Sequence, residues 1–193
     1  MRGLIGFFNL TSWWQTALDE RERTLICDRW TYIGLSGTGR YWYEEAEISS
    51  WPESAVRVVG GIANMFQKDG ERHIAHKILE KAESMIGDET SILDTHFLYM
   101  SKIETTYRDS NIHECIDACY QQIGISRKTA AAFRAEYRGP LVEHTGYKRL
   151  AMIREHQGEF LECARVCHEA LSEGWAGDWI ERATRCAERE KKR

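Results

Sequence analysis

The sequence predicts an all-α protein in which antiparallel helical hairpins stack as a short solenoid that ends in a C-terminal capping helix. Apolar residues recur at helical spacing almost continuously from Ser54 to the end of the chain. Glycine and Asx residues, which accept the left-handed backbone angles that end helices, interrupt this pattern. The two prolines, Pro52 and Pro140, both lie between helical runs. Because the connections are short, neighbouring helices are expected to pack antiparallel.

Pro52 separates two regions of different composition: an aromatic-rich N-terminal module, residues 1–51, and a helical domain, residues 52–193. The module holds five of the seven tryptophans, which are Trp13, Trp14, Trp30, Trp42 and Trp51. We interpret them as the core of a small module that lies against the first hairpin, since large aromatic rings stabilise most when buried. The alternative is that some are exposed and form a surface through which copies of the chain associate into a homo-oligomer.

Local signals divide the N-terminal module further. Asn9 or Thr11 is expected to cap a short helix that runs through Trp13 and Trp14. Asp19 is expected to begin a second helix, from Glu20 to about residue 32. A loop is expected over residues 34–39, and residues 40–47 fit either a short strand or an irregular segment.

The helical domain is expected to contain a helix in each stretch between its breaks. The expected ranges are 54–68, 71–86, 91–108, 112–123, 126–138, 142–157, 159–173 and 178–191. The last of these suits a cap, because one side is apolar and the other is charged. Its apolar side is expected to carry Trp179, Ile180, Ala183 and Cys186, and its polar side Glu181, Arg182, Arg185 and Glu188.

An internal repeat is the strongest pattern in the chain. Two hairpins, centred on Gly70 and Gly158, match at four positions: a large apolar residue followed by Ala in the first helix, and a small residue and an Ala in the second. The matched residues are Ile62, Ala63, Ala75 and Ala82 in one hairpin, and Leu150, Ala151, Cys163 and Ala170 in the other. A middle hairpin around Asn111 follows the pattern with Ile103 and Cys115, but Glu104 stands where a small residue belongs.

In these positions the chain resembles the tetratricopeptide repeat (TPR) family, over roughly residues 54–191. The anchors lie farther apart than the family's regular spacing, and residues 126–138 are the expected insertion. The resemblance implies a TPR-like solenoid whose first helices line a concave, partner-binding surface. Its groove positions correspond here to Arg57, Asn64, Gln67, Lys68, Ser101, Thr105, Arg108, Lys148, Met152 and His156.

The groove positions include four basic side chains and no acidic one, which would suit an acidic peptide or a chain terminus. We therefore expect a non-catalytic protein-binding or adaptor module whose partner is a protein or peptide. One alternative is a regulator or immunity-type protein that occludes a dedicated enzyme partner. Another, from a different class, is a small metal-dependent enzyme that uses cysteine and histidine clusters.

The net charge and the hydropathy of the chain argue against two classes of partner, nucleic acids and membranes. The formal net charge is −4, whereas general nucleic-acid binding needs a strongly basic face, so nucleic acid is not the expected partner. No apolar run is long enough for a transmembrane helix, and no membrane partner is expected. The six cysteines lie in apolar runs, which favours small buried hydrophobic residues in a reducing, cytoplasmic compartment.

No catalytic residue, metal or cofactor is expected. Residues 34–41 resemble a phosphate-binding loop, but Arg40 and Tyr41 stand where Lys and Ser or Thr are needed, so a flexible surface loop is favoured. Two Cys-x3-Cys pairs each place two thiols on one helix face, and together they could form a four-sulfur zinc site; packing is favoured instead. Most of the seven histidines neighbour charged residues, which is typical of solvated helix faces.

Overall fold

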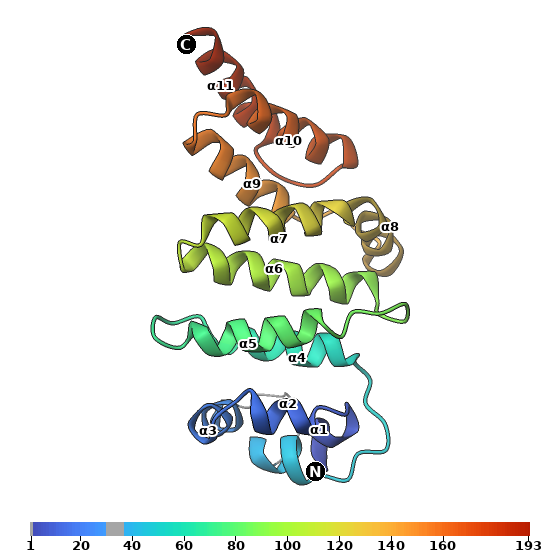
Figure 1. The fold of residues 1–193 in the computed structure, drawn as a ribbon. Helices are drawn as coiled ribbons and strands as arrows, with labels where there is room; N and C mark the ends of the chain where they lie inside the picture. The colour runs from blue at the N-terminus through green and yellow to red at the C-terminus, as the bar shows by residue number, and fades with distance from the viewer. Residues whose placement is uncertain (1, 30–36) are drawn as a thin grey trace. The chain divides into compact units, whose positions relative to one another are not determined.

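The computed structural model describes residues 2–29 and 37–193, and within these ranges the chain is helical, with one isolated β-bridge between Glu143 and Ala176 (Figure 1). The all-α fold class is therefore confirmed. The chain divides into two compact units, Met1–Asp88 and Glu89–Arg193, each described by itself below.

The first unit begins with three short helices: α1 (Gly3–Phe7), α2 (Thr11–Thr16) and α3 (Glu20–Asp28). A single π-helical turn, η1 (Tyr41–Glu45), lies against α1. Gly3 is required at this contact, because its φ is +62° and a Cβ atom there would lie 2.4 Å from the Tyr43 carbonyl carbon. The backbone N–H of Gly3 donates to Ala46 O at 2.9 Å, which ties the chain start to the end of η1.

The tryptophans of the N-terminal region divide between core and surface. Trp14 is fully buried and stacks on Tyr43 with ring centroids 5.7 Å apart, and its indole N–H donates to Glu44 Oε1 at 2.9 Å. Trp13, Trp42 and Trp51 are half-buried. The expected aromatic core thus forms around Trp14 alone among the described tryptophans of this region; Trp30 lies outside the described residues.

Two N-terminal expectations are wrong. The helix through Trp13 and Trp14 has Leu10 at its N-cap and no side-chain cap, because Thr11 is already helical and Asn9 takes a left-handed φ of 57°. Residues 41–45 form a helical turn, not a strand. By contrast, Asp19 caps α3 in a full capping box with Glu22. Helix α3 ends at Asp28, with Arg29 as its C-cap, before the expected end near residue 32. The start of the expected loop, residues 34–36, lies outside the described residues.

The first unit continues into a helical hairpin, α4 (Ala55–Ala63) followed by the short 3-10 turn η2 (Asn64–Phe66) and then α5 (Arg72–Glu83). Polar contacts from α3 hold this hairpin to the N-terminal helices. Arg29 donates to Met65 O at 2.7 Å and pairs with Glu71 at 2.6 Å, and Lys77 pairs with the buried Glu22 at 2.8 Å. These contacts explain why the unit boundary falls at Asp88 and not at Pro52, where the composition changes.

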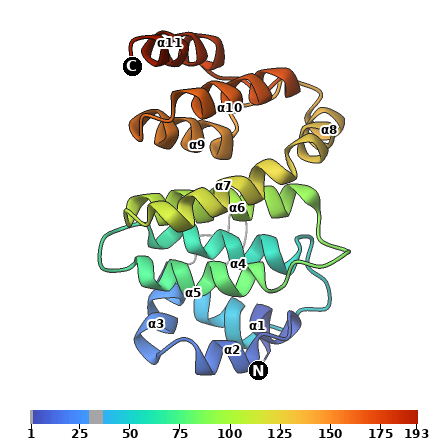
Figure 2. The ribbon, with the colours of Figure 1, turned by 45° about the horizontal axis from the view of Figure 1, so that its top comes forward.

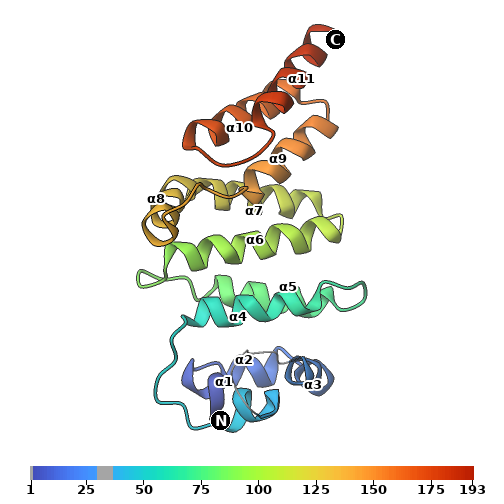
Figure 3. The same cartoon turned by 180° about the vertical axis from the view of Figure 1, so that it is seen from behind.

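The second unit holds six helices: α6 (Ile92–Arg108), α7 (Ile112–Gly124), α8 (Ser126–Tyr137), α9 (Thr145–His156), α10 (Phe160–Glu173) and α11 (Trp179–Lys191). Figure 3 shows α6 and α7 packed along their length, with α8 at one end of the pair. Figure 2 shows α9, α10 and α11 side by side. The sequence-based ranges are confirmed to within a few residues. Gly158 and Gly174, with φ of +74° and +86°, end α9 and α10 as expected.

Most of the core of this unit is one cluster, to which all six helices contribute. Five of the cysteines belong to it, and all six cysteines of the chain are buried and free, as expected for small apolar side chains. On α11, Trp179, Ala183 and Cys186 are buried in the cluster. Ile180 was expected on the same side but is 63 % exposed. The buried side of α11 is narrow, and Ile180 points outside the stripe that Trp179, Ala183 and Cys186 form along the helix.

Helices α7 and α9 approach closely at Gly146. A Cβ atom there would lie 2.8 Å from the Gln122 side-chain oxygen and 3.1 Å from the backbone oxygen of Cys119. The buried Gln122 amide accepts from Gly146 N–H at 2.7 Å and donates to His96 O at 2.9 Å. One side chain of α7 therefore joins α6 to α9.

Candidate functional site

Helix α9 has one buried face and one partly exposed stripe. Tyr147, Leu150 and Ala151 are fully buried in the core. Lys148, Met152 and His156 follow one another at four-residue spacing, and so share a different face of the helix. Lys148 and Met152 are half-buried and His156 is exposed. We call these three residues the α9 stripe.

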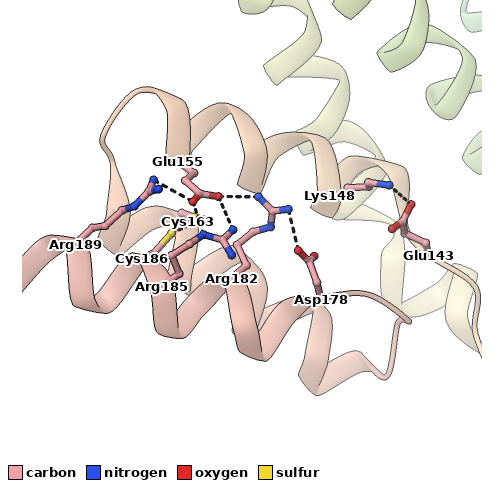
Figure 4. A network of polar contacts seen from close by, with 9 residues as sticks. All are labelled: Glu143, Lys148, Glu155, Cys163, Asp178, Arg182, Arg185, Cys186 and Arg189. Carbon is pink, nitrogen blue, oxygen red and sulfur yellow. Dashed lines mark hydrogen bonds and ion pairs between the residues drawn. The ribbon is translucent and has the colours of Figure 1, made fainter.

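Lys148 is the charged residue of the α9 stripe. Its ammonium pairs with Glu143 Oε1 at 2.6 Å, and the two side chains are 42 % and 46 % exposed (Figure 4). An ion pair this exposed stabilises the fold by about 1 kcal/mol or less. Lys148 can therefore exchange Glu143 for another carboxylate at little cost.

The expected groove residues of the middle hairpin need correction. Ser101 and Thr105 of α6 are buried, with 5 % and 0 % exposure. Their hydroxyls donate to carbonyl oxygens one turn earlier, Ser101 to Phe97 O at 3.1 Å and Thr105 to Ser101 O at 2.8 Å. A hydroxyl group that donates a hydrogen bond to a carbonyl oxygen of its own helix can be buried without loss. The identity of the residue alone therefore does not show whether a Ser or Thr is exposed. Only Arg108, at the end of α6, is exposed.

The remaining expected groove residues lie in the first unit, on α4, on η2 and in the turn that follows. Arg57, Asn64 and Lys68 are exposed. Gln67 is half-buried, and its side-chain amide donates to Ala63 O at 3.0 Å. The structure thus divides the expected groove positions between two units, four in the first and six in the second.

An arginine cluster around Glu155 is the most connected polar feature of the second unit. Glu155 of α9 accepts from Arg182, Arg185 and Arg189 of α11 at 2.7–3.2 Å (Figure 4). The hydrogen bond from Arg185 is the main reason that the pKa of Glu155 is lowered from 4.5. Sequence reasoning placed two of these arginines on a merely solvated face. The spacing of the three arginines along one face of α11 was the available signal.

Sulfur atoms lie beside this cluster. Cys163 Sγ of α10 and Cys186 Sγ of α11 are 3.1 Å apart, and these atoms and a Glu155 oxygen lie within 4.8 Å of one another. Within residues 2–29 and 37–193, this is the one group of three or more such ligand atoms near enough to share an ion. Among the same described residues, Cys115 and Cys119 do not come together with Cys163 and Cys167 as a four-sulfur site.

The donor set at Glu155 does not suit a cation. Both carboxylate oxygens accept hydrogen bonds from guanidinium groups, so a metal ion would face three positive charges at its carboxylate ligand. Two thiolates bound to one tetrahedral zinc ion keep their sulfurs about 3.8 Å apart, which is wider than the distance between Cys163 and Cys186. The cluster therefore resembles an internal ion-pair network more than a metal centre.

Two histidines depart from the expectation of solvated helix faces. His96 and His144 are 3 % and 0 % exposed, with ring centroids 5.1 Å apart, and Trp175 stacks on His96. His144 Nδ1 accepts from Tyr147 N–H and caps α9, whereas His96 Nδ1 and His144 Nε2 have no hydrogen-bond partner among the residues that the structure describes. Burial lowers the pKa of His96 to about 4 and that of His144 to about 3, so both rings are neutral at pH 7.

Comparisons with protein-family models, curated proteins and solved structures give no match to this chain. Among the described helices, none has both the length and the apolar composition needed to cross a bilayer.

Proposed function

We propose that the protein is a non-catalytic binding module that holds an acidic segment of a protein partner on the α9 stripe. The observation that carries this proposal is the combination of Lys148, Met152 and His156 on a partly exposed face of a helix whose opposite face is fixed in the core. A rigid helix presents such side chains at low conformational cost.

The α9 stripe offers three kinds of contact to one extended acidic peptide. Lys148 offers a compact positive charge, already paired with an exposed carboxylate that a partner can replace. Met152 offers an adaptable apolar contact. The exposed His156 ring adds hydrogen-bonding atoms at the end of the stripe. The resemblance to TPR proteins also supports partner binding by the first helix of a hairpin.

A display selection from a random peptide library against the full-length chain tests the proposal. Enriched peptides are expected to be rich in Asp and Glu. Their affinity, measured by fluorescence anisotropy, should fall about tenfold for Lys148→Glu, which corresponds to about 1.4 kcal/mol. It should also fall as salt is raised.

Lys128→Glu is the matched control. Lys128 is an exposed lysine on α8, and its replacement by Glu changes the net charge by the same amount as Lys148→Glu. This variant should bind the selected peptides like the unmodified chain. Equal losses for both variants would mean that attraction is to overall charge, and enriched peptides without acidic residues would contradict the proposal.

A further inference from the structure

The contact between Cys163 and Cys186 joins two helices. Cys163 lies in α10 and Cys186 in α11, and the S–H of Cys186 points to the Cys163 sulfur at 3.1 Å (Figure 4). Two further thiol pairs that are joined by hydrogen bonds, Cys115 with Cys119 and Cys163 with Cys167, each lie within a single helix. A bond between Cys163 and Cys186 would therefore link consecutive structural elements.

We infer that Cys163 and Cys186 are a site of reversible oxidation, at which a low-molecular-weight disulfide such as oxidised glutathione converts the two thiols to a disulfide that fastens α11 to α10. The sulfurs need to approach by only about 1 Å to reach the length of an S–S bond. The inference does not depend on the proposed partner binding.

The reaction exchanges one disulfide for another. The thiolate of one cysteine attacks a sulfur of oxidised glutathione, forms a mixed disulfide and expels one glutathione thiolate. The thiolate of the second cysteine then attacks the protein sulfur of that mixed disulfide and expels the other glutathione thiolate. Two protein thiols are oxidised, oxidised glutathione is reduced to two glutathione molecules, and the two protons pass from the cysteines to the leaving thiolates.

Burial controls when this reaction occurs. Both thiols are fully buried, and burial raises the pKa of Cys186 to about 12. The pKa of Cys163 is also raised, mainly by its hydrogen bond with Cys167. Because the thiolate is the reactive form, the packed pair is protected, and oxidation proceeds through local opening of α11. Once formed, the disulfide opposes that opening.

The test uses the full-length reduced protein, incubated under native conditions with oxidised glutathione, acid-quenched and alkylated. The expected product is lighter than the reduced protein by about 2 Da before alkylation, and peptide mapping should show Cys163 linked to Cys186. Dithiothreitol should reverse the link. The oxidised protein should melt at least about 4 °C higher than the reduced protein.

Cys186→Ala should abolish the product, whereas Cys167→Ala, which removes the neighbouring thiol on the same helix, should retain it. The peptide map of the unmodified chain decides the question even if a variant does not fold. The inference is overturned by a predominant Cys163–Cys167 link, by a persistent glutathione adduct, or by six unmodified thiols after an exposure that oxidises a dithiol peptide. Stoichiometric zinc on the purified protein would also overturn it, because the metal would hold these sulfurs.

Discussion

Glu155 has more positive neighbours than its single charge can neutralise. Arg182 and Arg185 lie beside it with side-chain exposures of 13 % and 41 %, and Arg189 adds a third guanidinium group. These contacts run from α9 to α11 and so bypass α10. The carboxylate therefore fixes the last helix to a helix that is not its neighbour in sequence.

Replacing Glu155 with Gln should reduce the free energy of unfolding by about 2 kcal/mol, because the partly buried guanidinium groups of Arg182 and Arg185 and the exposed one of Arg189 lose their shared anion. Urea denaturation at pH 7 measures this. The control Glu159→Gln removes a 49 % exposed carboxylate that pairs with Arg154, and should cost about 0.5 kcal/mol.

Because the pKa of Glu155 is lowered on folding, the stabilisation by this carboxylate is present above pH 4.5 and is lost as the pH falls through the folded-state value. Equal losses of unfolding free energy in Glu155→Gln and Glu159→Gln would contradict the role of Glu155 as the shared anion.

The buried histidines predict sensitivity to acid. Their folded pKa values lie below the unfolded value of 6.5, so the unfolded chain binds more protons and stability falls as the pH drops below 6.5. For His96 this loss is complete near pH 4 and amounts to at most about 3 kcal/mol. His96→Phe, which preserves an aromatic ring beside Trp175, should remove that part of the pH dependence in urea titrations between pH 7 and 4. The control His168→Gln, at an exposed position of α10, should leave the free energy of unfolding at pH 7 unchanged.

The close approach of α7 and α9 predicts a specific sensitivity at the scale of elements. Gly146→Ala should reduce the free energy of unfolding by about 2 kcal/mol, because the new methyl group would overlap the Gln122 amide that joins α6 to α9. Gly124→Ala is the control. Gly124 lies at the end of α7, and among the described residues no atom outside its own stretch of helix lies within 4 Å of the added Cβ, so this variant should be neutral or stabilise the fold slightly. Thermal unfolding of both variants measures the difference. A stable Gly146→Ala protein would mean that the helices can separate without loss.

The sequence predicts helices well and their contacts poorly. Helix ranges follow from local signals such as Gly158 and Gly174, whose left-handed angles end helices whatever lies around them. The resemblance to TPR proteins assigns Ser101 and Thr105 to a surface groove, but hydrogen bonds to their own helix allow them to be buried. The spacing of Arg182, Arg185 and Arg189 places them on one face of α11, but their contact with Glu155 of α9 depends on tertiary packing, which that spacing does not predict.

The division into two units makes a prediction for the whole molecule. The core cluster of the second unit runs from Ile103 to Cys186 and draws on residues of that unit alone. Residues 89–193 expressed alone should therefore fold into a helical protein that unfolds cooperatively, since a segment of this size can bury its own core. Circular dichroism with thermal melting measures this. A broad, non-cooperative melt would contradict it.

The exposed turn at Gly87, Asp88 and Glu89 lies where the two units meet in the sequence. Its side chains add nothing to either core, so extra residues inserted there would disturb few native contacts. Over evolutionary time, such a junction permits insertion, duplication or exchange of one half of the gene while the other half keeps its packing.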